Sequence, residues 1–185
     1  MALTLIKEDG TGKPDANTYA LAADGDAYHE AHSYASAWTS ASTGAKETAL
    51  AMATRLIDGL FQFNGFKRIS TQALQWPRRE CRDPDVENGV IPGLLLTRGP
   101  FLDETKVPPA VVNATCELAR ELIKQDRTDD PDGEGVRSLD LVGSLKIEFD
   151  TAGRQPVVPS LVQTWLAKFG EYIANSKGAA RLVRV

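Results

Sequence analysis

The chain has 185 residues, of which 42% are hydrophobic and 25% charged, a composition that excludes a wholly disordered protein. Its net charge of −4 and pI near 5.3 disfavour a protein that holds nucleic acid through a broad basic surface. Cys81 and Cys116 are too few for a disulfide scaffold or a four-thiolate zinc site, and no apolar run approaches the roughly 18 residues of a membrane span.

The first third of the chain is predicted to contain an arm and two helices. Residues 2–7 alternate loosely between apolar and polar types and favour an extended arm, which a glycine- and proline-rich loop follows. Small and apolar residues at helical spacing predict a helix over 22–34. Apolar residues at steps of three and four predict a longer helix over 44–61.

The most distinctive stretch is Thr-Gln-Ala-Leu-Gln-Trp-Pro-Arg-Arg at residues 71–79, which we call the strap. Pro77 fixes its own φ and favours an extended backbone at Trp76. The indole of Trp76 can bury a large apolar area. We therefore predict that Trp76 and Pro77 form a structural anchor, and that Arg78 and Arg79 form a cationic end able to contact a partner.

The second half alternates irregular segments with regular ones. Residues 82–106 read as a long loop, and the two prolines at 108 and 109 open a helix that runs to about residue 125. An acidic linker over 126–135 leads to two strand pieces within 136–150, and Ser160 caps a last helix whose apolar stripe includes Trp165 and Phe169.

These patterns together predict a mainly α-helical fold, a bundle of about four helices with a long loop and a small β-hairpin before the C-terminal helix. We expect residues 1–174 to form a single domain with an extended N-terminal arm. Residues 175–185 read as a flexible basic tail, and its Lys177, Arg181 and Arg184 are further candidates for partner contacts.

Motifs for catalysis or metal binding are weak. His29 and His32 can share one helix face, but no further ligands cluster near them, so they read as surface histidines. The acidic linker lacks the glutamate that completes a calcium loop, and no Gly-x-Ser-x-Gly nucleophile motif occurs. We expect no enzyme activity, no cofactor and no metal site.

One region has a pattern typical of single-stranded nucleic-acid binding. Within residues 61–79, aromatic residues interleave with cations, and bases could stack on the former while phosphates contact the latter. The region contains Phe63, Phe66, Lys67, Arg68, Trp76, Arg78 and Arg79. The alternative is that these aromatic side chains fill the core and the cations stay solvated, which the acidic net charge favours.

Several stretches, taken in order, resemble a family of tailed-bacteriophage proteins that act as head-to-tail connectors, or adaptors. They are residues 8–19, 26–29, 47–60, the strap through Arg78, residues 107–118 and residues 142–149. Some members of that family carry a DnaT-like single-stranded-DNA-binding label. The resemblance therefore supports two competing functions.

The resemblance implies a helical virion protein at the head-tail junction, made in the host bacterial cytoplasm. Copies would assemble as a homo-oligomeric ring, commonly twelvefold, that binds the portal protein and docks tail or nozzle proteins. Packaged double-stranded DNA would pass through the ring without sequence-specific binding, and no membrane would be involved. The alternative functions are a single-stranded-DNA-binding replication accessory protein and an interaction domain unrelated to phages.

Overall fold

The computed structural model describes residues 3–85, 101–129, 138–141, 145–148 and 156–173. Within these residues the helices are α1 (Ala22–Glu30), α2 (Ser36–Thr39), α3 (Thr43–Leu60), α4 (Pro109–Lys124) and α5 (Ser160–Leu166). The strands are β1 (Phe61–Phe63), β2 (Phe66–Lys67), β3 (Arg78–Arg79), β4 (Ser138–Leu141), β5 (Leu145–Glu148) and β6 (Gly170–Tyr172). Helices and small sheets are therefore mixed, and the prediction of a helical bundle is only partly right.

The two long helices agree with the sequence prediction to within one residue at each end. The hydroxyl of Ser42 caps α3 by accepting a hydrogen bond from the backbone N–H of Ala45, at 3.3 Å. Two prolines open α4, where a helix has no partner for its first N–H groups. Each helix buries one apolar stripe, with Leu50 and Ile57 on α3 and Leu118 on α4 fully buried.

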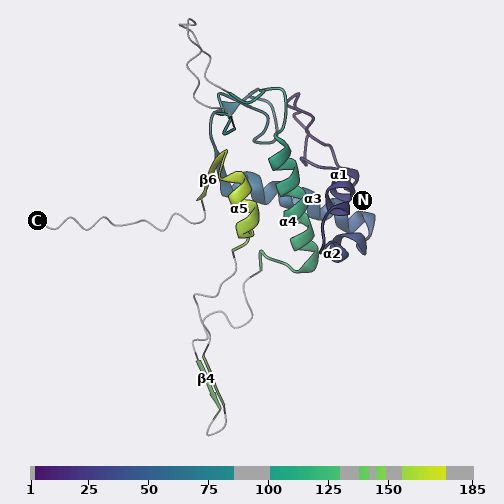
Figure 1. Cartoon of the computed structure of the whole chain (residues 1–185), viewed down its shortest axis with the longest axis vertical. Helices are drawn as coiled ribbons and strands as arrows, with labels where there is room; N and C mark the ends of the chain where they lie inside the picture. The colour runs from purple at the N-terminus through teal and green to yellow at the C-terminus, as the bar shows by residue number, and fades with distance from the viewer. Residues whose placement is uncertain (1–2, 86–100, 130–137, 142–144, 149–155, 174–185) are drawn as a thin grey trace, which may run out of the picture.

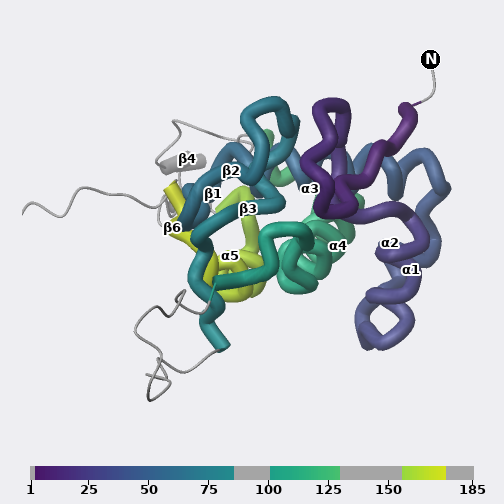
Figure 2. The backbone as a smooth tube through the Cα atoms, turned by 90° about the horizontal axis from the view of Figure 1, so that it is seen from above, coloured from purple at the N-terminus to yellow at the C-terminus, as the bar shows by residue number. Residues whose placement is uncertain are grey.

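Helix α4 is the central element of the helical body. It packs against α1, α2, α3 and α5. Figures 1 and 2 show α1 and α2 at one end of this body, and β1 and β6 at the opposite end beside α5. The strap therefore lies at the end of the helical body where α3, α5, β1 and β6 meet.

The sheets are two-stranded and antiparallel. They pair β1 with β6, β2 with β3, and β4 with β5, and the last pair lies within the 136–150 segment that was expected to form strands. The prediction of one continuous C-terminal helix is wrong, because α5 ends at Leu166 and β6 pairs with β1 instead. Gly170 makes this pairing possible: a Cβ there would lie 2.4 Å from the carbonyl oxygen of Gln62.

The predicted first helix is also shorter than expected. It ends at Glu30, and a separate short helix, α2, carries the buried Trp38 back across α1. Gly25 permits this packing, since a Cβ there would lie 2.3 Å from the Trp38 ring. Most of the predicted long loop (86–100), most of the acidic linker (130–135), Gly143 and the basic tail lie outside the described residues.

Candidate functional site

A buried polar network joins the strap, at Gln75 and Trp76, to the N-terminal segment and to α3. The Tyr19 hydroxyl donates to Asp58 Oδ1 at 2.5 Å and accepts from the backbone N–H of Trp76 at 3.1 Å. The backbone N–H of Gln75 donates to Asp58 Oδ2 at 2.9 Å. Two side chains from distant parts of the sequence thus fix the backbone of the strap just before Pro77.

Burial strongly affects the ionisation of this network. Loss of water around the carboxyl raises the pKa of Asp58 to about 6, and the hydrogen bonds that it accepts only partly oppose this rise. Burial also raises the pKa of Tyr19 well above its usual range, and the neighbouring Asp58 carboxylate acts in the same direction. The phenol therefore remains a hydrogen-bond donor at neutral pH.

Trp76 lies in the core and has no exposed surface. Its ring meets Phe63 edge-on at a centroid distance of 5.5 Å and Phe169 at 5.9 Å. Edge-to-face packing of this kind adds to the apolar burial. The Trp76–Pro77 peptide bond is cis. No face of the indole is open to a base.

Arg78 is buried as well, with 7% of its surface exposed. Its guanidinium donates to the carbonyl oxygens of Asn64 (2.8 Å), Phe63 (3.0 Å) and Gly65 (2.6 Å). It also donates to the carbonyl and the side-chain oxygen of Gln75, at 3.1 and 2.9 Å. All five donors of the fork are therefore used inside the chain. Arg78, expected as a partner contact, instead fastens the strap to the turn after β1.

Two other cations of the predicted nucleic-acid patch are also bound to the backbone. Arg68 Nη1 donates to the carbonyl of Gly10 at 2.7 Å, and Lys67 Nζ donates to the carbonyls of Gln72 and Ala73 at 3.4 and 3.3 Å. Of the patch, Phe66, with 66% exposure, and Arg79 remain on the surface. They face each other in the β2–β3 pair.

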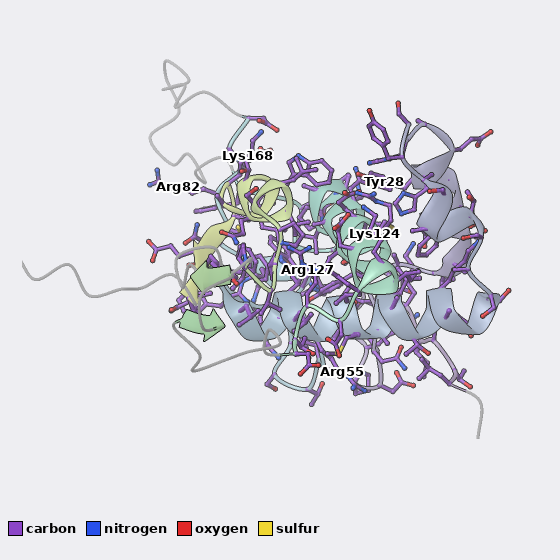
Figure 3. The ribbon with its side chains drawn as sticks, turned by 90° about the horizontal axis from the view of Figure 1, so that it is seen from below. Tyr28, Arg55, Arg82, Lys124, Arg127 and Lys168 are labelled. Atoms are coloured by element: carbon purple, nitrogen blue, oxygen red, sulfur yellow. The ribbon has the colours of Figure 1, made fainter. Side chains whose placement is uncertain are left out.

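The cations that Figure 3 labels do not form one track. They come from separate parts of the chain: Arg55, Arg82, Lys124, Arg127 and Lys168. Lys124 and Arg127 share the carboxylate of Glu121, at 2.8 and 3.3 Å. Lys168 Nζ lies 3.4 Å from an oxygen of Asp85. Three of the five thus have an acidic partner, although Lys124 and Arg127 share one, and this disfavours a phosphate path across this face.

One concave feature of the described residues combines an apolar lining with several acidic side chains. A groove of about 850 Å³ lies between the N-terminal turn at 7–9, residues 83–85 and the segment 102–112 that leads into α4. Five acidic and two basic residues line it, together with apolar side chains such as those of Val107 and Phe169. The acids are Glu8, Asp9, Asp83, Asp85 and Asp103. We call this feature the acidic groove.

Local hydrogen bonds keep two of these acids ionised. The side chain of Thr105 hydrogen-bonds Asp103 and lowers its pKa to about 2. The side chain of Lys13 hydrogen-bonds Asp9 and lowers its pKa far below the usual range. Glu8 is itself buried and accepts from the backbone N–H groups of Gly10, Gly12 and Lys13 at 2.8 to 2.9 Å. The groove therefore presents negative charge at neutral pH.

The two histidine rings lie side by side, with centroids 5.7 Å apart, and the expectation that both are surface residues is wrong for one of them. His29 is 2% exposed, and its Nε2 lies 3.2 Å from the carbonyl oxygen of Cys116. His32 Nε2 lies 3.6 Å from the carboxylate of Glu117, which also pairs with Arg120. Burial lowers the pKa of His29. In the described part of the chain, no three His, Cys, Asp or Glu side chains gather as a metal site.

Both thiols are free and buried. Burial raises the pKa of Cys116 to about 12 and raises that of Cys81 as well. Thiols in such surroundings are protonated at neutral pH and react slowly.

The family is shown by a match over almost the whole chain. A family model described as "Putative DnaT-like ssDNA binding protein" matches residues 3–185. The chain belongs to this family. No curated protein and no solved structure matches the chain. None of the helices in the described residues is both long and apolar enough to cross a membrane.

The family description points to DNA binding, but the geometry of the strap does not offer its main candidate residues to DNA. The description names single-stranded DNA, whereas Trp76 and Arg78, the strongest stacking and phosphate-binding candidates of the strap, are enclosed by the chain itself. Phe66 and Arg79 are the members of the predicted patch that a base or phosphate could reach directly.

Sequence reasoning missed the residues that hold the strap. Tyr19 and Asp58 lie 39 positions apart, and no local pattern links them. An aspartate on the otherwise apolar stripe of α3 was the one available signal, because a buried carboxylate needs partners. The acidic groove was missed too, since it joins the N-terminal turn at 7–9 to two segments that lie more than seventy residues further along the chain.

Proposed function

We propose that the chain is a structural protein of a tailed-phage particle, a head-to-tail adaptor. In this role, copies form a ring beneath the portal protein, extend the DNA channel and provide a docking surface for tail components. The ordered resemblance from residue 8 to residue 149 supports this assignment. Packaged double-stranded DNA then passes through the ring without specific contacts.

The observation that carries the proposal is the enclosure of the strap. Trp76 and Arg78 contact Tyr19 of the N-terminal segment, Phe63 of β1 and Phe169, which follows α5, so these residues serve the stability of the subunit. The acidic groove holds more acidic than basic side chains, which repels a DNA backbone and suits protein contacts. An assembly subunit needs both properties: a rigid body and surfaces that take protein partners.

Binding to the portal protein tests the proposal. The full chain is co-expressed with the portal protein of the phage genome that encodes it, the portal is captured by a tag, and the mass of the complex is measured by light scattering. We expect the chain to co-purify in a fixed, ring-sized ratio to the portal. Failure to bind the portal, with the chain folded by circular dichroism, contradicts the proposal.

A second candidate function is single-stranded-DNA binding in replication. The family description and the exposed Phe66 beside Arg79 favour it. A salt-dependent fluorescence titration with a labelled oligonucleotide tests it. On this alternative, the double variant Phe66→Ala, Arg79→Ala weakens binding at least about tenfold without loss of folding, whereas the adaptor proposal predicts no specific affinity to lose.

A further inference from the structure

The acidic groove has the chemistry of a site for a basic, partly apolar peptide. Its lining includes the apolar side chains of Leu102, Val107 and Val112 together with four aspartates. Asp83 has no cationic partner among the described residues. An extended peptide that carries both aliphatic and basic side chains would match both parts of this lining.

The lysines that already meet these aspartates do not block such a peptide. Lys106 Nζ lies 3.1 Å from Asp103, and Lys168 Nζ lies 3.4 Å from Asp85. Both lysine side chains are more than half exposed, at 75% and 57%. Exposed pairs of this kind contribute little stability, so arginines of a peptide can replace them at small cost.

The chain itself contains a segment of the matching type. Its C-terminal residues read Lys177-Gly-Ala-Ala-Arg-Leu-Val-Arg-Val185. Three cations, Lys177, Arg181 and Arg184, alternate with the aliphatic Leu182, Val183 and Val185. The segment holds no acidic side chain, whereas acids outnumber bases in the groove.

The direction of β6 favours the groove of another copy. Phe169 lines the acidic groove, and β6 starts at the next residue and runs along β1 from Phe63 toward Phe61. The chain therefore leaves its own groove as it approaches the C-terminus. Twelve residues follow Ile173, enough to span up to about 40 Å when extended. To reach its own groove, the chain after β6 would have to turn back. It needs no such turn to reach the groove of a neighbouring copy.

We propose that residues 177–185 of one copy bind in the acidic groove of a neighbouring copy, with the arginines on the aspartates and the aliphatic side chains on the apolar lining. This contact rests on the proposed function insofar as a ring supplies the neighbour. It is heterologous, because tail meets groove, and such contacts repeat around a closed ring.

A charge-exchange experiment on the full chain tests the contact. The groove variant carries Asp83→Lys and Asp85→Lys, and the tail variant carries Arg181→Glu and Arg184→Glu. A control with the same charge change elsewhere carries Asp15→Lys and Glu30→Lys, both at exposed positions. Self-association is measured by sedimentation velocity over about 1–100 μM at low and high salt, and thermal unfolding checks that each variant is folded.

We expect the wild type and the control to associate, more weakly at high salt. The groove variant and the tail variant should each need at least about tenfold higher protein concentration than the wild type to reach the same degree of association. A mixture of the two variants should regain association, since the reversed groove of one then accepts the reversed tail of the other. A wild type that stays monomeric, or variants that associate like the wild type, overturns the contact.

The mixture also decides which copy supplies the tail. If each variant alone loses association and their mixture does not regain it, the tail lies in the groove of its own chain. The contact between copies is then contradicted. The outcome is separable from that of the adaptor proposal. A groove variant that still forms rings on the portal overturns this contact alone, whereas copies that associate through the tail without binding the portal contradict only the adaptor function.

Discussion

Arg78 and Arg79 are adjacent in the sequence, yet their surroundings are opposite. They form β3, where successive side chains point to opposite faces of the strand. Arg78 points inward and satisfies five acceptors, while Arg79 is exposed. The sequence showed two equal cations, and only the register of β3 distinguishes a structural arginine from one that can meet a partner.

This difference predicts unequal costs of substitution. Arg78→Met keeps much of the stem but removes every donor, leaving buried carbonyl groups without partners, and should lower the free energy of unfolding by about 2–4 kcal/mol. Arg79→Met should change it by less than about 0.5 kcal/mol. Urea unfolding followed by circular dichroism compares the two. Equal, small effects would show that Arg78 does not hold the strap.

Trp76 should be a major contributor to stability. Trp76→Ala leaves a large cavity between Phe63 and Phe169 and should cost about 3–5 kcal/mol in urea unfolding. The matched control is Tyr34→Ala, because Tyr34 is an aromatic residue with 77% exposure, and it should cost less than about 0.5 kcal/mol. A Trp76 variant as stable as its control contradicts the anchor role.

Asp58 should make stability depend on pH in an unusual direction. Its pKa of about 6 in the folded chain lies above the ordinary 3.8, so the folded state binds the proton more tightly than the unfolded state does. The Asp58 contribution to the free energy of unfolding is therefore lowest at neutral pH. It rises as pH falls through 6 toward 3.8, by at most about 3 kcal/mol.

The Asp58→Asn variant isolates this effect from other titrating groups. The free energy of unfolding of the wild type minus that of the variant should increase when the pH falls from 7 to 5. Chemical unfolding at several pH values measures the difference. A difference that is flat or decreases over this range means that the carboxyl is not held in an unfavourable charged state.

At the scale of elements, helices α3 and α4 could be predicted because their apolar periodicity extends over 18 and 16 residues. The strands of two or three residues could not, because tertiary neighbours such as Gly170 against Gln62 determine them. The strap was recognised from its composition. Its burial depends on hydrogen bonds to Tyr19 and Asp58, and no pattern in the sequence shows that these two residues meet.

The N-terminal turn shows how one glycine joins two segments. Gly10 has a φ of +99°, and a Cβ there would lie 1.9 Å from the carbonyl oxygen of Thr105. Gly10→Ala should therefore lower the free energy of unfolding by at least about 2 kcal/mol, through backbone strain and a clash that separates the turn from residues 102–106. Thermal or urea unfolding measures the loss.

Gly59 provides the control for this substitution. It lies in α3, and a Cβ there would meet nothing within 4 Å. Gly59→Ala should raise the free energy of unfolding by about 0.5–1 kcal/mol, because alanine is the better helix former. If both alanine variants behave alike, the turn does not depend on close contact with Thr105.

At the scale of the whole molecule, charge and shape favour protein partners over nucleic acid. The chain carries a net charge of −4, its described cations are largely paired, and the acidic groove holds five acids against two bases. A ring multiplies this charge around its axis, and acidic groups facing the channel would keep DNA from adhering as it passes. The basic tail is the exception, and the acidic groove of a neighbour is where we propose it binds.

The most direct test of the account is a reconstruction of the head-tail junction in purified phage particles by electron cryomicroscopy. We expect a ring of this chain directly beneath the portal, with Trp76 enclosed in every copy and the strap making no contact with DNA. Particles that lack the chain, or a ring in which Trp76 or Arg78 turns outward onto DNA, would contradict it.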